Sequence, residues 1–230
     1  MILLGALLVS VVIGMARGGR LGNLNQLRMR YEWLPLSLFL VQSSLVLFPV
    51  IESQALWNIQ ALAIVSSYAG LLAFLYLNRF LPGAKLILLG TVLNFAVILA
   101  NGGYMPVAPE ALRAAGHEDL TITRGERQYV LGSKDVVLER SQTRLAPLSD
   151  VLVIPEDTPL SGSFSMGDIV IAIGAFFLLN EALLGKCIAR GDSIFQRSKI
   201  QVPSASTAER HYPARPIPET ARPLSEARVP

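Results

Sequence analysis

Residues 84–103 read AKLILLGTVLNFAVILANGG, an apolar run that carries its only charge, Lys85, near the start. The run ends at an asparagine followed by two glycines, residues that favour a helix C-cap and a tight turn. This stretch therefore predicts an apolar helix over residues 84–100 that stops at Asn101.

Apolar blocks of the same kind occur at residues 1–16, 34–50, 56–77 and 169–185. Across the chain 52% of residues are hydrophobic and 16% are charged, against roughly 25% charged in soluble domains. Because polar connections separate the blocks, we expect an all-α membrane protein, a bundle of about five transmembrane helices. The first block would be about 24 Å long, near the lower limit for a ~30 Å hydrocarbon core.

Composition divides the chain into four parts. We expect a four-helix transmembrane region at 1–100, a long extracytoplasmic loop at 101–165, a fifth transmembrane helix at 166–189 and a Pro-rich tail at 190–230. In the loop, the pattern favours a short helix over 107–115 and a β-hairpin over 120–131. The tail cannot bury enough apolar area to offset its ordering entropy, so we expect disorder.

Basic residues follow the first, third and last apolar blocks, whereas the connection after the second block carries only Glu52. Short cytoplasmic connections collect Lys and Arg. The pattern predicts a multi-pass protein of the bacterial cytoplasmic (inner) membrane, with its N-terminus outside and its C-terminus inside. The net charge of +3 belongs to these connections and the tail. No basic stripe is interleaved with aromatic residues, so we expect no nucleic-acid partner.

Residue types that commonly hold metals or cofactors are scarce. The chain has one cysteine, Cys187, and two histidines, His117 and His211, which the predicted topology places on opposite sides of the bilayer. Neither a phosphate-binding loop nor a dinucleotide fingerprint occurs. We therefore expect no metal, no cofactor and no intramolecular disulfide.

Several segments resemble a bacterial membrane family known as domain of unknown function 5317. They are RGGRL at 17–21, the region of Leu27-Arg28 and Gln42, NGGYMPV at 101–107 and FSMGD at 164–168. The resemblance covers roughly residues 1–185 and leaves out the Pro-rich tail. It implies a membrane protein, and the family carries no activity to transfer.

Polar residues inside or beside the apolar blocks are the candidate sites. Gln42 and Asn94 are interpreted as hydrogen-bonding links between helices, with a ligand or quinone contact as the alternative. Arg17 and Arg20 are expected to anchor the cytoplasmic face, although the two glycines between them could admit a lipid phosphate. Glu181 is expected to reach the interface or pair with a nearby basic residue; the alternative is a proton or cation site.

Two further strings have a structural and a functional interpretation. Asn101, Gly102, Gly103 and Tyr104 form a turn with Tyr104 at the outer interface, or a loop that closes a pocket over the bundle. Asp168 completes a capping box with Ser165, while an anion site at that helix start is the alternative.

These observations favour a non-catalytic binding, assembly or sensory component over an enzyme. Its partners would be the lipid bilayer and possible proteins that contact loop 101–165 or tail 190–230. The alternative is a transporter or membrane-embedded enzyme acting on a lipid or other apolar substrate. That alternative requires four polar residues to line one concavity: Gln42, Asn94, Asn101 and Glu181.

Overall fold

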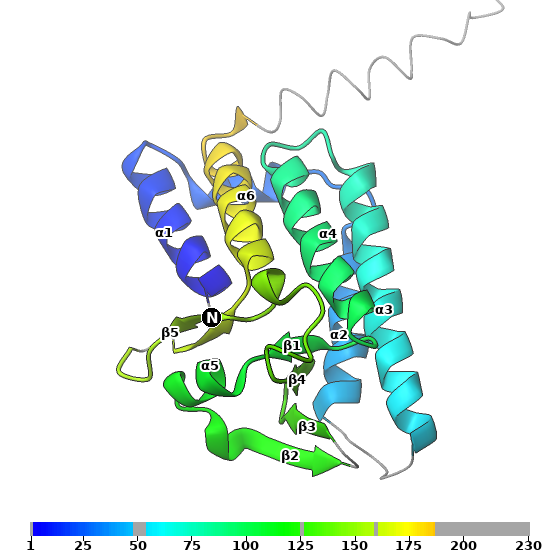
Figure 1. Ribbon diagram of the computed structural model, residues 1–230. Coiled ribbons are helices and arrows are strands. Elements are labelled where there is room, and N and C mark those ends of the chain that lie inside the picture. Colours follow the sequence, from blue (N-terminus) through cyan, green and yellow to red (C-terminus); the bar gives the residue numbers. More distant parts are fainter. Residues whose placement is uncertain (1, 48–53, 125–126, 159–160, 187–230) are drawn as a thin grey trace, which may run out of the picture. The chain divides into compact units, whose positions relative to one another are not determined.

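The computed structural model describes residues 2–47, 54–124, 127–158 and 161–186. Its long helices coincide with the predicted apolar blocks (Figure 1): α1 (Ile2–Ala16), α2 (Trp33–Leu47), α3 (Gln54–Leu77), α4 (Ala84–Ala100) and α6 (Met166–Leu183). A 3-10 helix, η1 (Leu21–Gln26), lies between α1 and α2. The expected disordered tail, residues 190–230, lies outside the described residues.

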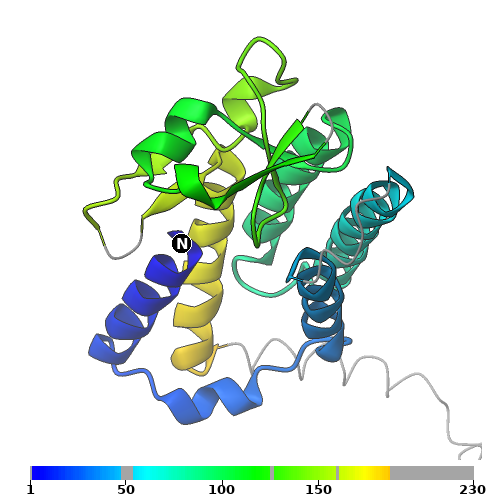
Figure 2. The same ribbon diagram turned by 90° about the horizontal axis from the view of Figure 1, so that it is seen from below.

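The helices pack as a row in the order α1, α6, α4, α3, α2. In the view from below, α1 lies at one side of this row and α2 with α3 at the other (Figure 2). The closest packing is between α4 and α6. Sequence neighbours therefore are not always spatial neighbours, because α6 inserts between α1 and α4.

Glycines explain how closely α4 approaches α6. A Cβ atom added to Gly90 would lie 2.5 Å from the carbonyl oxygen of Gly167, and one added to Gly174 would lie 2.8 Å from the carbonyl oxygen of Gly83. Small residues at helix interfaces let two backbones approach and pack. These four glycines fix α4 against α6 in an antiparallel pair.

Residues 101–165 form a segment with sheet structure. Its elements are β1 (Met105–Val107), α5 (Pro109–Ala114), η2 (Glu118–Leu120), β2 (Thr121–Arg124), β3 (Arg127–Val130), β4 (Asp135–Val137), η3 (Ala146–Leu148), β5 (Leu152–Ile154) and β6 (Gly162–Phe164). The four-stranded sheet has the order β1-β4-β3-β2, with β1 parallel to β4, while β5 and β6 form an antiparallel pair. The short helix and the β2–β3 hairpin were predicted. The all-α class was too simple, because β1 pairs with a strand about thirty residues later, and local pattern does not reveal such pairing.

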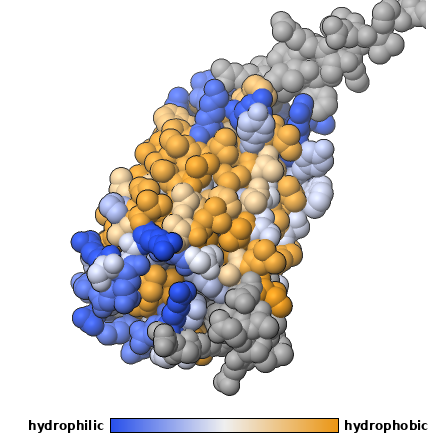
Figure 3. All heavy atoms as spheres, turned by 45° about the vertical axis from the view of Figure 1, so that its right-hand side comes forward, coloured by the Kyte–Doolittle hydropathy of each residue, from blue (hydrophilic) through white to orange (hydrophobic). Residues whose placement is uncertain are grey.

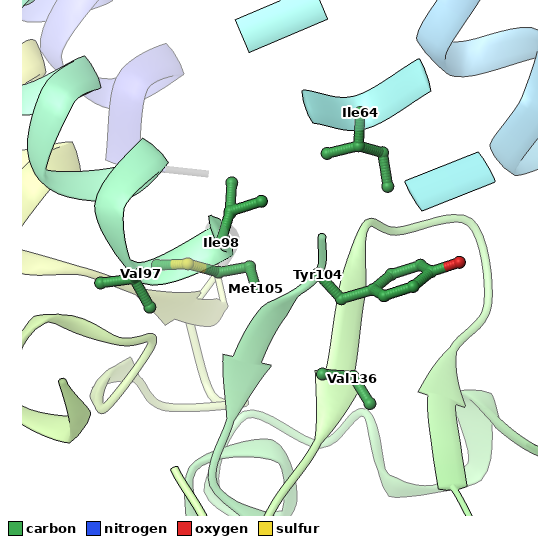
Figure 4. Packing of buried hydrophobic residues seen from close by; sticks show 6 residues of the cluster. All are labelled: Ile64, Val97, Ile98, Tyr104, Met105 and Val136. Atoms are coloured by element: carbon green, nitrogen blue, oxygen red, sulfur yellow. The ribbon is translucent and has the colours of Figure 1, made fainter. Parts of the chain in front are cut away.

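A buried apolar cluster joins this segment to α3 and to the end of α4. Figure 4 shows its residues: Ile64, Val97, Ile98, Tyr104, Met105 and Val136. Tyr104 is only 4% exposed, and its ring contacts that of Tyr129 edge to face. The prediction that Tyr104 anchors the outer interface was therefore wrong. Its ring packs inward because the chain turns back against the helices after Gly103.

The outer surface of the helices is largely apolar. By length and composition, residues 59–77 of α3 and 166–183 of α6 are able to cross a membrane, and α1 and α4 are shorter apolar helices. Only 22% and 33% of the two longer spans are buried, unlike the core helix of a soluble protein. Figure 3 shows hydrophobic residues covering the helical part of one face, with hydrophilic residues gathered at both ends.

A polar cavity between the helix row and residues 101–165

A partly open cavity of about 460 Å³ lies between the row of helices and the 101–165 segment. Every long helix contributes to its lining. This volume falls within the ~300–1,000 Å³ range of small-molecule sites. Much of the wall is apolar: Leu38, Phe39, Leu71, Ile87, Phe164 and Ile171. Phe39 is 64% exposed, so α2 forms an open edge of the cavity.

Asn94 and Asp168 meet where α4 and α6 line the cavity. Asn94 Nδ2 donates to Asp168 Oδ1 at 2.8 Å, and Ser165 Oγ donates to Asn94 Oδ1 at 2.9 Å. The predicted capping box is present, because the backbone N–H of Asp168 donates to Ser165 Oγ and that of Ser165 donates to Asp168 Oδ2. Gly167 is required beside this network, since a Cβ there would collide with Asn94. These bonds hold both side chains in fixed positions.

The opposite wall comes from α2 and α3. Ser67 Oγ lies 3.2 Å from Gln42 Oε1 and also donates to the carbonyl of Ile64 at 2.8 Å. Tyr68 lines the cavity beside Ser67, and its ring stacks on Phe95 of α4. Gln42 thus contacts Ser67 of the neighbouring helix, as the first interpretation expected, and also lines the cavity.

Lys134, Asp135 and Asp150 line the cavity from the 101–165 segment. Strand β1 positions two of them: the N–H of Met105 donates to the carbonyl of Lys134, and the N–H of Asp150 donates to the carbonyl of Pro106, each at 3.1 Å. The NGGYMPV string therefore contains the strand that fixes Lys134 and Asp150 beside the helices.

The charges in this group influence one another. Lys134 Nζ lies 3.3 Å from Asp135 Oδ1. Burial alone would lower the pKa of Lys134, but Asp135, with Tyr68 and Asp150, raises that pKa well above its ordinary value. Burial raises the pKa of the Asp150 carboxyl to about 7, against the opposing attraction of Lys134. Lys134 is thus held charged, whereas Asp150 titrates near neutral pH.

Asp150 has an incomplete set of hydrogen bonds. The residue is 3% exposed, and its Oδ1 atom has no hydrogen-bond partner among the described residues. A buried acceptor without a donor costs roughly 1–3 kcal/mol. By contrast, Asp135 accepts from Ser133 and Lys134, and Asp168 accepts from Asn94 and Ser165. Asp150 is therefore the carboxylate with acceptor capacity left.

Two of the four residues required by the transporter or enzyme alternative do not line the cavity. Asn101 caps the end of α4: its Nδ2 donates to the carbonyls of Val97 and Arg144, and its Oδ1 accepts from the N–H of Arg144. Glu181 lies near the other end of α6, where its Oε1 is 3.4 Å from Lys186 Nζ. Gly102 and Gly103 complete the turn after α4 with positive φ angles of 80° and 93°.

Arg17 and Arg20 are exposed beyond the end of α1. Arg17 reaches Asn180 Oδ1 at 3.4 Å, and the N–H of Arg20 donates to the carbonyl of Leu183 at 3.0 Å. Gly19 packs against Leu183, because a Cβ there would lie 2.9 Å from the leucine Cβ. This string thus joins α1 to the end of α6, away from the cavity.

Sequence reasoning missed the charged cavity residues. Lys134, Asp135 and Asp150 lie in the predicted extracytoplasmic loop, and none of them was a candidate site. Their convergence depends on β1 lying between residues that are distant in sequence. The related feature in the sequence was the NGGYMPV string, which was interpreted as a turn or as a loop that closes a pocket over the bundle.

Comparison with known proteins yields one match. The model of a family of unknown function, DUF5317, matches residues 26–180. No curated protein and no solved structure matches the chain. The matched region contains every polar residue that lines the cavity.

Proposed function

This chain belongs to the DUF5317 family, whose function is unknown, and we propose that it is an integral membrane protein that binds an amphiphilic small molecule. The site is the cavity between the helix row and residues 101–165. The observation that carries this proposal is the composition of the cavity wall. Apolar side chains from five helices surround it, and charged and amide groups gather where the 101–165 segment meets the helices.

The membrane assignment rests on the outward faces of the helices. Large apolar side chains are exposed on successive turns, including Leu8 at 56%, Val12 at 68% and Leu62 at 65%. Contiguous apolar surface of this kind marks contact with a membrane or a partner. Basic residues lie in the connections at the ends of the helices opposite the 101–165 segment. We therefore place the 101–165 segment outside and these connections inside.

Alkaline carbonate extraction tests the membrane assignment. An integral protein stays with the membrane pellet, because its helices are held by apolar contact with lipid. Reporter fusions at residue 130 and at residue 22 then distinguish the two sides, with the first expected outside and the second inside. Release of the chain by carbonate would contradict the assignment, and a cytoplasmic position for residue 130 would contradict the orientation.

A cavity of mixed character suits a molecule with one polar end and an apolar body. The apolar walls would surround the body and exclude water, which strengthens polar contacts at the other end. Phe39, at the open edge on α2, would be the first contact for a molecule arriving from the bilayer. A non-catalytic binding role uses all of these features without requiring a reaction.

A cavity-filling variant tests the site. We expect Leu71→Trp, which adds volume on the cavity wall, to remove any amphiphile that copurifies with the full chain. The matched control is Leu62→Trp on the outward face of the same helix, where Leu62 is 65% exposed. The measurement is mass spectrometry of small molecules extracted from each purified protein. Equal amounts of the same molecule in both variants would contradict the proposal.

The second candidate is a transporter or membrane-embedded enzyme for a lipid. Its support is that Gln42 and Asn94 do line one cavity. Asn101 and Glu181 lie elsewhere, so only two of the four polar residues that this alternative requires line the cavity. Transport of a bound amphiphile between leaflets of a reconstituted vesicle would favour it over simple binding.

A further inference from the structure

The unpaired acceptor atom of Asp150 indicates that the polar end of a bound molecule must supply a hydrogen-bond donor. Asp150 Oδ1 is buried and lacks a donor among the described residues, and Asp150 is one of the residues that line the cavity. Buried polar groups in proteins are nearly always paired, and each exception calls for an explanation. A ligand that donates a hydrogen bond there would complete the set.

The charge of the cavity lining narrows the choice of donor. Among the described residues that line it, three carboxylates, Asp135, Asp150 and Asp168, accompany a single basic side chain, Lys134. Asp135 already pairs with that lysine. When Asp150 is ionised, the remaining excess is negative, so a cationic donor is favoured over a neutral one, because charge-assisted hydrogen bonds are roughly twice as strong as neutral ones.

A metal ion does not fit this arrangement. Within the described part of the chain, no group of three His, Cys, Asp or Glu side chains is placed to hold a metal. Asp168 is also committed to Asn94 and to its helix cap. An organic cation needs only one carboxylate, and its apolar part can occupy the rest of the cavity.

We propose that the ligand is an amphiphile with a protonated primary amine, and that Asp150 accepts a hydrogen bond from the ammonium group while Leu38, Leu71 and Ile171 contact its apolar chain. This inference rests on the proposed binding function. It assigns Asp150 as the residue that selects the polar end.

The test compares four probes that share one alkyl chain: dodecylamine, dodecyltrimethylammonium, dodecanol and dodecanoate. Each is titrated into the full chain in a neutral maltoside detergent, and bound probe is measured by native mass spectrometry. We expect dodecylamine to bind at least about tenfold more tightly than the others. Dodecyltrimethylammonium carries the same charge but has no N–H to donate, so it separates hydrogen bonding from charge.

Two variants complete the test. Asp150→Asn should remove the preference for dodecylamine, whereas Asp157→Asn, the same change at an exposed position, should retain it. Equal binding of dodecylamine and any other probe, or an unchanged preference in Asp150→Asn, would overturn the amine assignment and leave the cavity as an amphiphile site. If no probe binds better to the wild-type chain than to Leu71→Trp, the proposed function itself fails.

Discussion

The two sides of the helix row, α1 with α6 and α4 on one and α3 with α2 on the other, pack through different contacts. On one side, α1, α6 and α4 pack through glycines and buried polar bonds, including Asn180 Nδ2 to Ser10 Oγ at 2.8 Å. On the other side, the contacts between α2 and α3 include the end of the Leu38 side chain against Gly70 and the longer Ser67–Gln42 contact of 3.2 Å. A backbone-to-backbone contact cannot yield, whereas a contact between side-chain ends can adjust.

This difference suits a binding cavity. The close-packed side holds Asn94 and Asp168 in place, and the side chain of Phe39 on the looser side is exposed at the cavity edge. We therefore expect changes on the α4–α6 side to affect stability and changes on the α2–α3 side to affect binding. Four predictions test this division.

The largest effect is expected for Gly90→Ala. Alanine is favoured over glycine inside a helix by about 1 kcal/mol, but the new Cβ would meet the backbone of Gly167 and Ile171. Overpacking of this kind costs about 1–3 kcal/mol and occasionally more. We expect a large fall in thermal stability, measured by a detergent-based unfolding assay. Unchanged stability would show that α4 and α6 do not approach as closely as described.

The next effect concerns Asp150 and pH. The raised pKa, about 7 against 3.8, means that the folded protein keeps a proton that the unfolded chain loses between these values. The contribution of the Asp150 carboxyl group to stability should therefore be greatest below about pH 4. This contribution should be lost as the pH rises towards 7 and above. Asp150→Asn should remove that fall and be the more stable protein at pH 8, because an amide carries no charge to bury.

Thermal melts at pH 5 and pH 8 measure this difference, with Asp157→Asn as the exposed control. Parallel pH profiles for the wild-type chain and Asp150→Asn would contradict the burial of the carboxyl group.

A smaller effect on stability is expected when either of two polar side chains that link helices, Asn180 or Gln42, is removed. Asn180→Ala removes a buried amide that bonds to Ser10, and we expect a loss of about 1 kcal/mol, typical of the stronger hydrogen bonds between membrane helices. Gln42→Ala should cost less stability but should weaken amphiphile binding, because Gln42 lines the cavity. Melting temperature and probe binding are measured on both variants. An equal loss of probe binding in Asn180→Ala and Gln42→Ala would contradict the division between the two sides.

The smallest effect is expected for Gly70→Ala on α3. The added Cβ would lie 3.0 Å from the end of the Leu38 side chain, which can move. The gain in helix propensity should roughly offset this shift, so stability should change by less than about 0.5 kcal/mol. A fall as large as that of Gly90→Ala would show that α2 and α3 are packed as rigidly as α4 and α6.

The sequence predicted the helices well because each apolar block contains its own signal. Asn101 with its two glycines marked the end of α4, and Ser165 with Asp168 marked the start of α6. Gln42 and Asn94 were also found, since an amide in an apolar block is conspicuous. Ser10 was not, because a serine can bond within its own helix and so carries little information about a neighbour.

The cavity could not be predicted from local pattern. Its charged residues converge only when β1 pairs with β4 and bridges to Asp150, and Lys134 or Asp150 alone looks like any loop charge. Tyr104 was misplaced for the same reason, since an aromatic residue after a membrane helix suggests an interface anchor unless the following strand is known to fold inward.

Photolabelling with a long-chain primary amine that carries a diazirine on its alkyl chain tests the cavity most directly. We predict that labelled peptides of the full chain map to cavity-lining Leu38, Leu71 and Ile171, and that Asp150→Asn reduces this labelling. Label confined to outward-facing residues such as Val12 and Leu62, and unchanged in Asp150→Asn, would contradict the account.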